Sequence, residues 1–252
     1  MRIAIISDIH ANLEALDAVL NSVGPVDRFL CLGDIVGYGP DPNECVERVR
    51  SLPGMVCVAG NHDLAAVGKY DHDWFNAHAR AAIEWTQRKL TDSSRQFLEQ
   101  LPLIARVDDL TLVHGALPEP MDYITGPAEA LSTFQEMQKM QTPVCLIGHT
   151  HVAEYYRLPC PAGQPGSLGR IEHRYLTDGG RIAIEPGSYY VVNCGGVGQP
   201  RDGNPHAAFG IFDSEARTIE IKRVAYDIEQ VQHKMQDAGL PPLLSERLSY
   251  GR

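Results

Sequence analysis

The sequence predicts a layered α/β fold, and three observations lead to that prediction. Short runs of almost entirely apolar residues, such as residues 2–7, are typical of strands that are buried on both faces. Between these runs lie segments such as residues 12–23, in which apolar side chains recur at helical spacing. Several apolar runs also end abruptly in a short polar block that contains glycine, aspartate or histidine.

Strands and helices alternate regularly as far as residue 65. Asn12 can cap the first helix, and Pro42 lies near the first turn of the second. The predicted order is strand 2–7, helix 12–23, strand 28–32, helix 42–52 and strand 55–59.

The elements expected after residue 65 continue this pattern. Residues 71–101 have a helical pattern that is broken near residues 91–93, where a second helix can be capped. Further along, the patterns predict strands within 104–113, a helix at 127–140, a strand at 144–147, a hairpin of strands 207–213 and 218–224, and a helix at 227–238.

Two segments have less regular patterns. Residues 155–190 contain Pro, Gly and turn signals, and we interpret them as an insertion of strands and hairpins. Residues 240–252 have no pattern, and we expect them to be loosely ordered. Because we find no repeat and no convincing linker, we predict a single domain over residues 1–252.

Composition limits the classes of partner. With 22 basic and 32 acidic residues, the chain has a formal charge of -10, so we expect no general attraction to nucleic acid or to an anionic membrane. A small anionic substrate would need a local positive centre, which bound metal would provide. The six cysteines form no Cys-x-x-Cys pair, and we interpret them as buried thiols in a reducing compartment. No signal peptide or long apolar segment is recognisable, so we expect a soluble cytoplasmic protein.

Five polar blocks follow apolar runs and hold half of the ten histidines of the chain. Their aspartate, asparagine and histidine side chains are too many for one metal ion and suit two. In chain order the blocks are Asp8-Ile9-His10, Gly33-Asp34, Gly60-Asn61-His62-Asp63, His114-Gly115 and Gly148-His149-Thr150-His151.

The spacing of these blocks indicates a metal site at the carboxyl ends of strands. Asp8 and His10 are two residues apart at a predicted strand end, so we expect both side chains to project to one side and to bind one ion. His149 and His151 share that spacing. In open α/β sheets the carboxyl ends of the strands are where ligands bind. Each block alone is weak evidence, and the ordered set carries the prediction.

The order of the blocks resembles the calcineurin-like metallophosphoesterase superfamily, whose pattern is D-x-H, G-D, G-N-H-D/E, H and G-H-x-H. A closer resemblance is to a bacterial and archaeal branch with the motifs S-D-I-H-A-N and G-D-x-V-G-Y-G-P, which here lie at 7–12 and 33–40. That branch also has a late N-P-G-S-V-G-Q-P-R-D-G motif. It reads N-C-G-G-V-G-Q-P-R-D-G at 193–203, so any role of the serine hydroxyl does not carry over.

The resemblance implies a four-layer αββα sandwich of two mixed β-sheets flanked by helices. It also implies two divalent transition-metal ions (Mn, Fe, Co, Ni or Zn, with Mn favoured), which mixed nitrogen and oxygen ligands suit. The implied ligands are Asp8, His10 and His151 for one ion, Asn61, His114 and His149 for the other, and Asp34 as the bridge.

The implied mechanism is attack of a metal hydroxide on phosphorus, at ions ~3.5–4 Å apart. With two divalent ions, two aspartates and one hydroxide, the site keeps a charge of about +1 and attracts phosphate. His62 is the candidate for protonating the leaving oxygen or stabilising its charge. Asp63 either orients His62 or caps a helix.

Two further residues have open roles. Arg201, in the late Gly- and Pro-rich loop, is a candidate for binding a second phosphate or a nucleotide moiety, and a structural salt bridge is an equal alternative. Tyr38 either lines the pocket or packs within the core.

We therefore predict a metallophosphoesterase that hydrolyses phosphodiester or nucleotide phosphoanhydride bonds of a small molecule. Relatives on this branch are often labelled as similar to diadenosine tetraphosphatases or to protein Ser/Thr phosphatases, and a phosphomonoesterase, acting on phosphoprotein, is the alternative. The acidic composition disfavours a nuclease. A non-catalytic scaffold is disfavoured because every ligand of the pattern and His62 are present.

Overall fold

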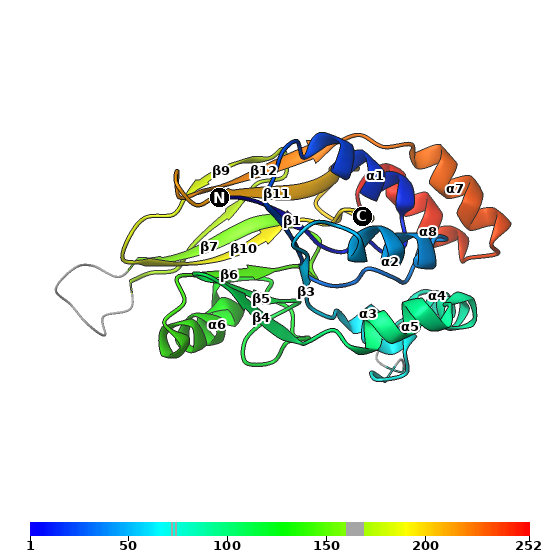
Figure 1. Ribbon diagram of the computed structural model, residues 1–252, viewed down its shortest axis with the longest axis horizontal. Helices are drawn as coiled ribbons and strands as arrows, with labels where there is room; N and C mark the ends of the chain where they lie inside the picture. Colours follow the sequence, from blue (N-terminus) through cyan, green and yellow to red (C-terminus); the bar gives the residue numbers. More distant parts are fainter. Residues whose placement is uncertain (72, 74, 160–168) are drawn as a thin grey trace.

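The computed structural model describes residues 1–71, 73, 75–159 and 169–252. Within them, two mixed six-stranded sheets pack face to face, with helices on their outer faces (Figure 1). This arrangement confirms the predicted αββα sandwich.

The first sheet contains the amino-terminal strands of the chain. Its parallel part is formed by three strands that end at the same edge. The strand order is β3 (Val56–Cys57), β2 (Arg28–Cys31), β1 (Arg2–Ile6), β11 (Ala207–Asp213), β12 (Thr218–Val224) and β9 (Gly180–Ala183). The last three strands are antiparallel to their neighbours, and β11 and β12 form the predicted hairpin.

The second sheet has a parallel centre of β5, β6 and β10 with antiparallel neighbours on both sides. Its strand order is β4 (Ile104–Val107), β5 (Leu110–Val113), β6 (Val144–Ile147), β10 (Ser188–Cys194), β7 (Ala153–Pro159) and β8 (Glu172–Tyr175).

Three apolar clusters hold the four layers together. Ile5 and Leu30 of the first sheet meet Leu146 and Val192 of the second in the cluster between the sheets. A second cluster lies between the first sheet and the helices α1 (Leu13–Ser22) and α2 (Pro42–Arg50). A third joins the second sheet to α6 (Pro127–Met140). The five described cysteines are buried and free, as expected, and Cys160 lies outside the described residues.

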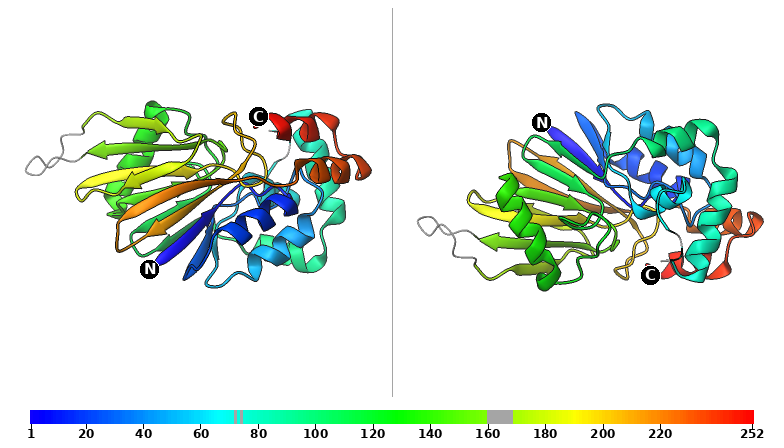
Figure 2. Two further views of the ribbon diagram at one scale, coloured as in Figure 1. Left: turned by 90° about the horizontal axis from the view of Figure 1, so that it is seen from above. Right: turned by 90° about the horizontal axis from the view of Figure 1, so that it is seen from below.

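The remaining helices gather at one end of the sandwich (Figure 2). They are α3 (Asn61–Ala66), α4 (Ala77–Lys89), α5 (Asp92–Glu99), α7 (Ile228–Asp237), α8 (Pro242–Glu246) and a 3₁₀ helix (Arg247–Tyr250). None of the helices that the structure describes has the length and apolar character needed to cross a bilayer.

The segment 240–252 differs from the prediction of a loosely ordered tail. It forms α8 and the 3₁₀ helix, and Leu244 and Leu248 pack against Ala82 of α4 and Met235 of α7 in a fourth apolar cluster. Helices of five and four residues are too short for a periodic pattern, so only tertiary packing reveals this order.

The segment 155–190 contributes to both sheets. The strands β7 and β8 pair in the second sheet, whereas β9 crosses to the first and pairs with β12. Residues 160–168 of this segment lie outside the described residues.

Candidate metal centre

Two groups of buried side chains meet where the strands β1, β2, β5 and β6 end. In each group the candidate ligand atoms lie within 4.8 Å of one another. The groups are Asp8, His10, Asp34 and His151, and Asp34, His114 and His149. Asp34 belongs to both groups.

The loops that carry these side chains have an unusual backbone. Asp8, His10, Asp34, His149 and His151 all have positive φ angles between 50° and 67°. Side chains with a Cβ rarely adopt this region, and each such residue costs on the order of 1–3 kcal/mol. The side chains therefore converge through left-handed turns beyond the strands. The prediction that Asp8 and His10 project to one side because of strand geometry is wrong in its reason, since β1 ends at Ile6.

The carboxylate of Asp34 lies between the two groups. Its Oδ2 atom is 3.7 Å from Nε2 of His10 and 3.3 Å from Nε2 of His114. Its Oδ1 atom accepts a 2.9 Å hydrogen bond from the main-chain N–H of His62. One oxygen is thus held by the protein, and the other faces a histidine of each group.

The tautomers of His10 and His151 follow from their hydrogen bonds. Nδ1 of His10 is 3.2 Å from the carbonyl oxygen of Val36, and Nδ1 of His151 is 2.6 Å from that of Gln199. A carbonyl oxygen only accepts, so both Nδ1 atoms carry the hydrogen and both Nε2 atoms of the neutral rings present a lone pair. These two Nε2 atoms are 3.1 Å apart. Two lone pairs at this distance repel unless a cation lies between or beside them.

The second group shows the same arrangement. Nδ1 of His114 donates to the carbonyl oxygen of Leu32 at 2.7 Å, so its Nε2 faces inward, 3.2 Å from Oδ1 of Asn61. Nε2 of His149 is buried and has no hydrogen-bond partner among the described residues. Histidine ligands of metals commonly donate their other ring nitrogen to a carbonyl in this way.

Electrostatics favour a positive charge at the centre. Burial lowers the pKa values of His10, His149 and His151 well below the ordinary value, so these rings are neutral. Burial also lowers the pKa of His114, but the carboxylates of Asp34 and Asp8 outweigh it and raise that pKa to about 10. The neutral rings of His10, His149 and His151 beside buried carboxylates are a donor set that fits divalent transition-metal ions, and a bound cation would replace the proton that the carboxylates favour on His114.

His62 lies beside this centre at the start of α3. Burial lowers its pKa to about 4, so the ring is neutral near pH 7. Its Nδ1 atom packs against Gly37, since a Cβ on that glycine would lie 2.5 Å away, and it has no hydrogen-bond partner among the described residues. The ring of Tyr38 lies 4.4 Å from the ring of His62 and 4.6 Å from that of His10. Tyr38 thus both lines the pocket and packs against two site histidines.

Asp63 does not orient His62 through its carboxylate. Oδ1 of Asp63 accepts from the main-chain N–H groups of Ile35 and Val36 at 2.9 and 3.1 Å, and Oδ2 accepts from Gly60 at 3.1 Å. Its carboxylate therefore caps α3 and fastens the loop after Asp34 to that helix.

The late motif at 193–203 forms hydrogen bonds with the loops of the centre. Nδ2 of Asn193 donates to the carbonyl oxygen of Gly148 at 2.6 Å and to the hydroxyl of Thr150 at 2.9 Å. The main-chain N–H of Gly198 donates to the carbonyl oxygen of Asp8 at 2.9 Å. The motif thus supports the loops that carry Asp8 and His149, a role that its sequence alone did not predict.

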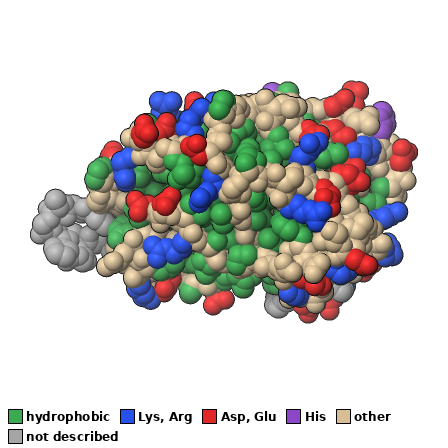
Figure 3. Space-filling model, in the orientation of Figure 1, with side chains coloured by type: hydrophobic (Ala, Val, Ile, Leu, Met, Phe, Trp, Pro, Cys, Tyr) green, Lys and Arg blue, Asp and Glu red, His purple; other side chains and the backbone are tan. Residues whose placement is uncertain are grey.

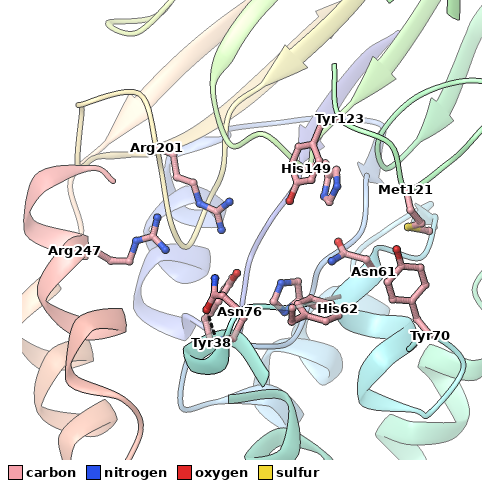
Figure 4. A pocket seen from close by; sticks show the side chains of 12 residues that line it. Tyr38, Asn61, His62, Tyr70, Asn76, Met121, Tyr123, His149, Arg201 and Arg247 are labelled. Atoms are coloured by element: carbon pink, nitrogen blue, oxygen red, sulfur yellow. Dashed lines mark hydrogen bonds between the residues drawn. The ribbon is translucent and has the colours of Figure 1, made fainter. Parts of the chain in front are cut away.

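A cavity of about 400 Å³ opens onto the centre (Figure 4). Its lining includes Asn61, His62 and His149. The side chains of Arg201 and Arg247 reach into it from the side opposite Tyr70 (Figure 4).

Tyr123 and Arg247 are among the lining residues that were not identified from the sequence. Tyr123 stacks on the ring of His149 at 3.7 Å, and Arg247 comes from the segment predicted to be loosely ordered. Arg201, which was identified, lies 5.7 Å from the ring of Tyr38.

Comparisons with known proteins agree with this geometry. The sequence matches the model of the calcineurin-like phosphoesterase superfamily domain over residues 1–217. A protein from Methanocaldococcus jannaschii is 38% identical over 99% of this chain and 98% of its own length. The symmetrical bis(5'-nucleosyl)-tetraphosphatase of Methylococcus capsulatus is 30% identical over 48% of this chain. That match covers 44% of the enzyme, so the similarity to it is partial.

Solved structures share the whole fold. A metallophosphoesterase from Sphaerobacter thermophilus is 44% identical, covers 100% of this chain and 99% of its own, and superimposes with a TM-score of 0.84. A hypothetical protein from Pyrococcus horikoshii has a TM-score of 0.75 at 20% identity and covers 100% of this chain and 98% of its own, which indicates a common fold.

Proposed function

Because the chain belongs to the calcineurin-like phosphoesterase superfamily, we propose that it hydrolyses phosphodiester or phosphoanhydride bonds of a small nucleotide-like molecule at a centre of two divalent metal ions. That the chain is a metallophosphoesterase, and hence a hydrolase, follows from its family. The number of ions, the type of bond and the substrate are our proposals.

The pair of inward-facing lone pairs on His10 and His151 carries the proposal of a metal centre. One ion would be held by Asp8, His10 and His151, and the other by Asn61, His114 and His149, with Asp34 shared. When bound, two such ions lower the pKa of a water molecule and neutralise the phosphoryl oxygens.

The neutral ring of His62 suits stabilisation of the leaving oxygen better than transfer of a proton to it. With a pKa of about 4, His62 holds few protons near pH 7 and acts instead as an N–H hydrogen-bond donor. Arg201 would bind an anionic part of the substrate, since its guanidinium group reaches into the cavity.

Several observations support a small nucleotide-like substrate. The cavity is of a size typical for small ligands, and Tyr70 and Tyr123 provide aromatic surface for a base. Some relatives are named as bis(5'-nucleosyl)-tetraphosphatases, and this name describes an enzyme that acts on a nucleotide. On the face seen in Figure 3, basic and acidic side chains are interspersed, which suits a small molecule better than a nucleic-acid strand. The buried free thiols are consistent with a cytoplasmic location.

The test is a comparison of substrates on the manganese-loaded protein. Bis-p-nitrophenyl phosphate, p-nitrophenyl phosphate, cyclic nucleotides and diadenosine tetraphosphate would be assayed under one set of conditions. We expect hydrolysis of the diester and the dinucleotide to exceed that of the monoester. A clear preference for p-nitrophenyl phosphate would instead identify a phosphomonoesterase.

A further inference from the structure

Two guanidinium groups from distant parts of the chain share one cavity. Arg201 belongs to the late motif after β10, and Arg247 begins the 3₁₀ helix near the end of the chain. Both are partly buried, and both point into the cavity beside the candidate metal centre (Figure 4).

Neither guanidinium group forms an ion pair with an aspartate or glutamate of the described residues. Nε and Nη2 of Arg201 donate to the side-chain oxygen of Gln199 at 3.3 and 2.8 Å. Nε of Arg247 donates to the main-chain oxygen of Arg252. The side-chain oxygen of Gln199 and the main-chain oxygen of Arg252 thus position the two guanidinium groups, and neither group has an aspartate or glutamate partner among the described residues.

This arrangement favours the binding of an anion. Burial and the neighbouring charge of Arg201 lower the pKa of Arg247. In a chain with a formal charge of -10, aspartate and glutamate are plentiful, and Arg223 has one as a close partner. Two like charges that face the same cavity are typical of a site for a doubly charged or extended anionic ligand.

The two arginines line the same cavity as His62. The ring of Tyr38 contacts the rings of His10 and His62 and lies 5.7 Å from the guanidinium carbon of Arg201. A group bound by the arginines is therefore next to the position proposed for the reacting phosphate.

We propose that Arg201 and Arg247 form a second phosphate subsite, so that the substrate carries at least two linked phosphate groups. The inference rests on the proposed function, because the first of these phosphates is the one at the metal centre. Each planar guanidinium group can donate two parallel hydrogen bonds to phosphate oxygens. A diester with a single phosphate would leave these donors without a charged partner.

The test measures binding to the full-length, manganese-loaded protein by calorimetry, with probes that are not hydrolysed. Methylenediphosphonate has two linked phosphonate groups and methylphosphonate has one. We expect the first to bind at least about tenfold more tightly, and Arg247→Gln to remove most of that preference. Arg88→Gln, which neutralises an exposed arginine of α4 away from the cavity, is the matched control and should retain it.

A preference that is unchanged in Arg247→Gln would overturn the proposal, because the metal ions alone would then account for it. If Arg247→Gln fails to fold, Arg201→Gln tests the same subsite from another element and should give the same loss. Hydrolysis of bis-p-nitrophenyl phosphate and of diadenosine tetraphosphate by the unmodified protein is measured in parallel. Hydrolysis of either compound together with no preference for the diphosphonate refutes the subsite and leaves the proposed function intact, whereas hydrolysis of neither compound counts against the proposed function itself.

Discussion

Gly60 and Asp34 are packed so closely that a Cβ atom on Gly60 would lie 2.0 Å from Oδ1 of Asp34. The φ angle of Gly60 is -96°, which any residue can adopt, so glycine is needed here for space and not for its conformation. The backbone at the start of α3 thus presses against the carboxylate that both groups of candidate ligands share.

Substitution of Gly60 should therefore disrupt the whole centre. In Gly60→Ala the new methyl group must displace the carboxylate of Asp34, and we expect loss of most bound metal and at least about a tenfold fall in kcat/KM. Metal per chain is measured by atomic emission spectrometry. Gly126→Ala is the control, because the Cβ there would meet only the flexible end of Glu129, at 3.2 Å. Full metal content in Gly60→Ala would mean that Asp34 is not a ligand.

Asp34 and Asp8 should differ in how many ions they hold. Asp34→Asn weakens the shared ligand, so we expect the loss of both ions, whereas Asp8→Asn should lose one of the two. Metal stoichiometry after dialysis against metal-free buffer distinguishes the variants. Equal losses in the two variants would contradict a bridging position for Asp34.

His62 should affect turnover without affecting metal content. We expect His62→Asn to lower kcat by about 10²–10⁴-fold, with the larger effect on substrates that have poor leaving groups. The comparison is between an activated p-nitrophenyl ester and an alkyl ester of the same acid. His78→Asn, at an exposed position of α4, is the control. Equal rates in His62→Asn and the unmodified protein would show that His62 has no role in the reaction.

Asp202 should be important for stability. Its carboxylate pairs with Arg223 where the two side chains are only 2% and 6% exposed, and it also accepts from the N–H of Ala153 at 3.1 Å. Removing one partner of a buried pair costs about 3–5 kcal/mol, and we expect Asp202→Asn to lower the free energy of unfolding by this amount. Urea denaturation followed by circular dichroism gives the value.

The control for Asp202 is an exposed pair of the same kind. Asp17 pairs with Arg48 at 3.0 Å with 38% and 48% of the side chains exposed, so Asp17→Asn should change stability by less than about 1 kcal/mol. A small effect in both variants would show that the loop at 201–203 does not depend on the buried pair.

Apolar periodicity predicted a layered α/β fold and most elements, because this periodicity is a direct consequence of burial. The four-layer sandwich of two sheets was implied by the resemblance to the superfamily. The candidate ligands were identified because they form short motifs after apolar runs. In contrast, the role of Asp63 remained ambiguous. An aspartate at this position is expected both for capping the helix and for orienting His62, so the residue type does not distinguish the two roles. Its partners Ile35 and Val36 are distant in sequence, so only the folded chain decides between the two.

Arg247 could not be predicted for a different reason. It lies in a short segment whose order depends on contacts of Leu244 and Leu248 with α4 and α7, and no local pattern records such contacts. Likewise, the left-handed turns at Asp8 and His10 are maintained by hydrogen bonds to Gly33, Asp34 and the late motif. Residues with a Cβ do not favour these turns by themselves.

The position of β1 between β2 and β11 determines when this protein can fold during synthesis. All seven proposed ligands have been synthesised by residue 151, yet β1 has a neighbour on only one side until the strand at 207–213 emerges. A nascent chain with every ligand therefore still has an open strand edge at the base of the loop that carries Asp8. We therefore expect metal to bind late in synthesis, after β1 has paired with β11, which lies about two hundred residues further along the chain.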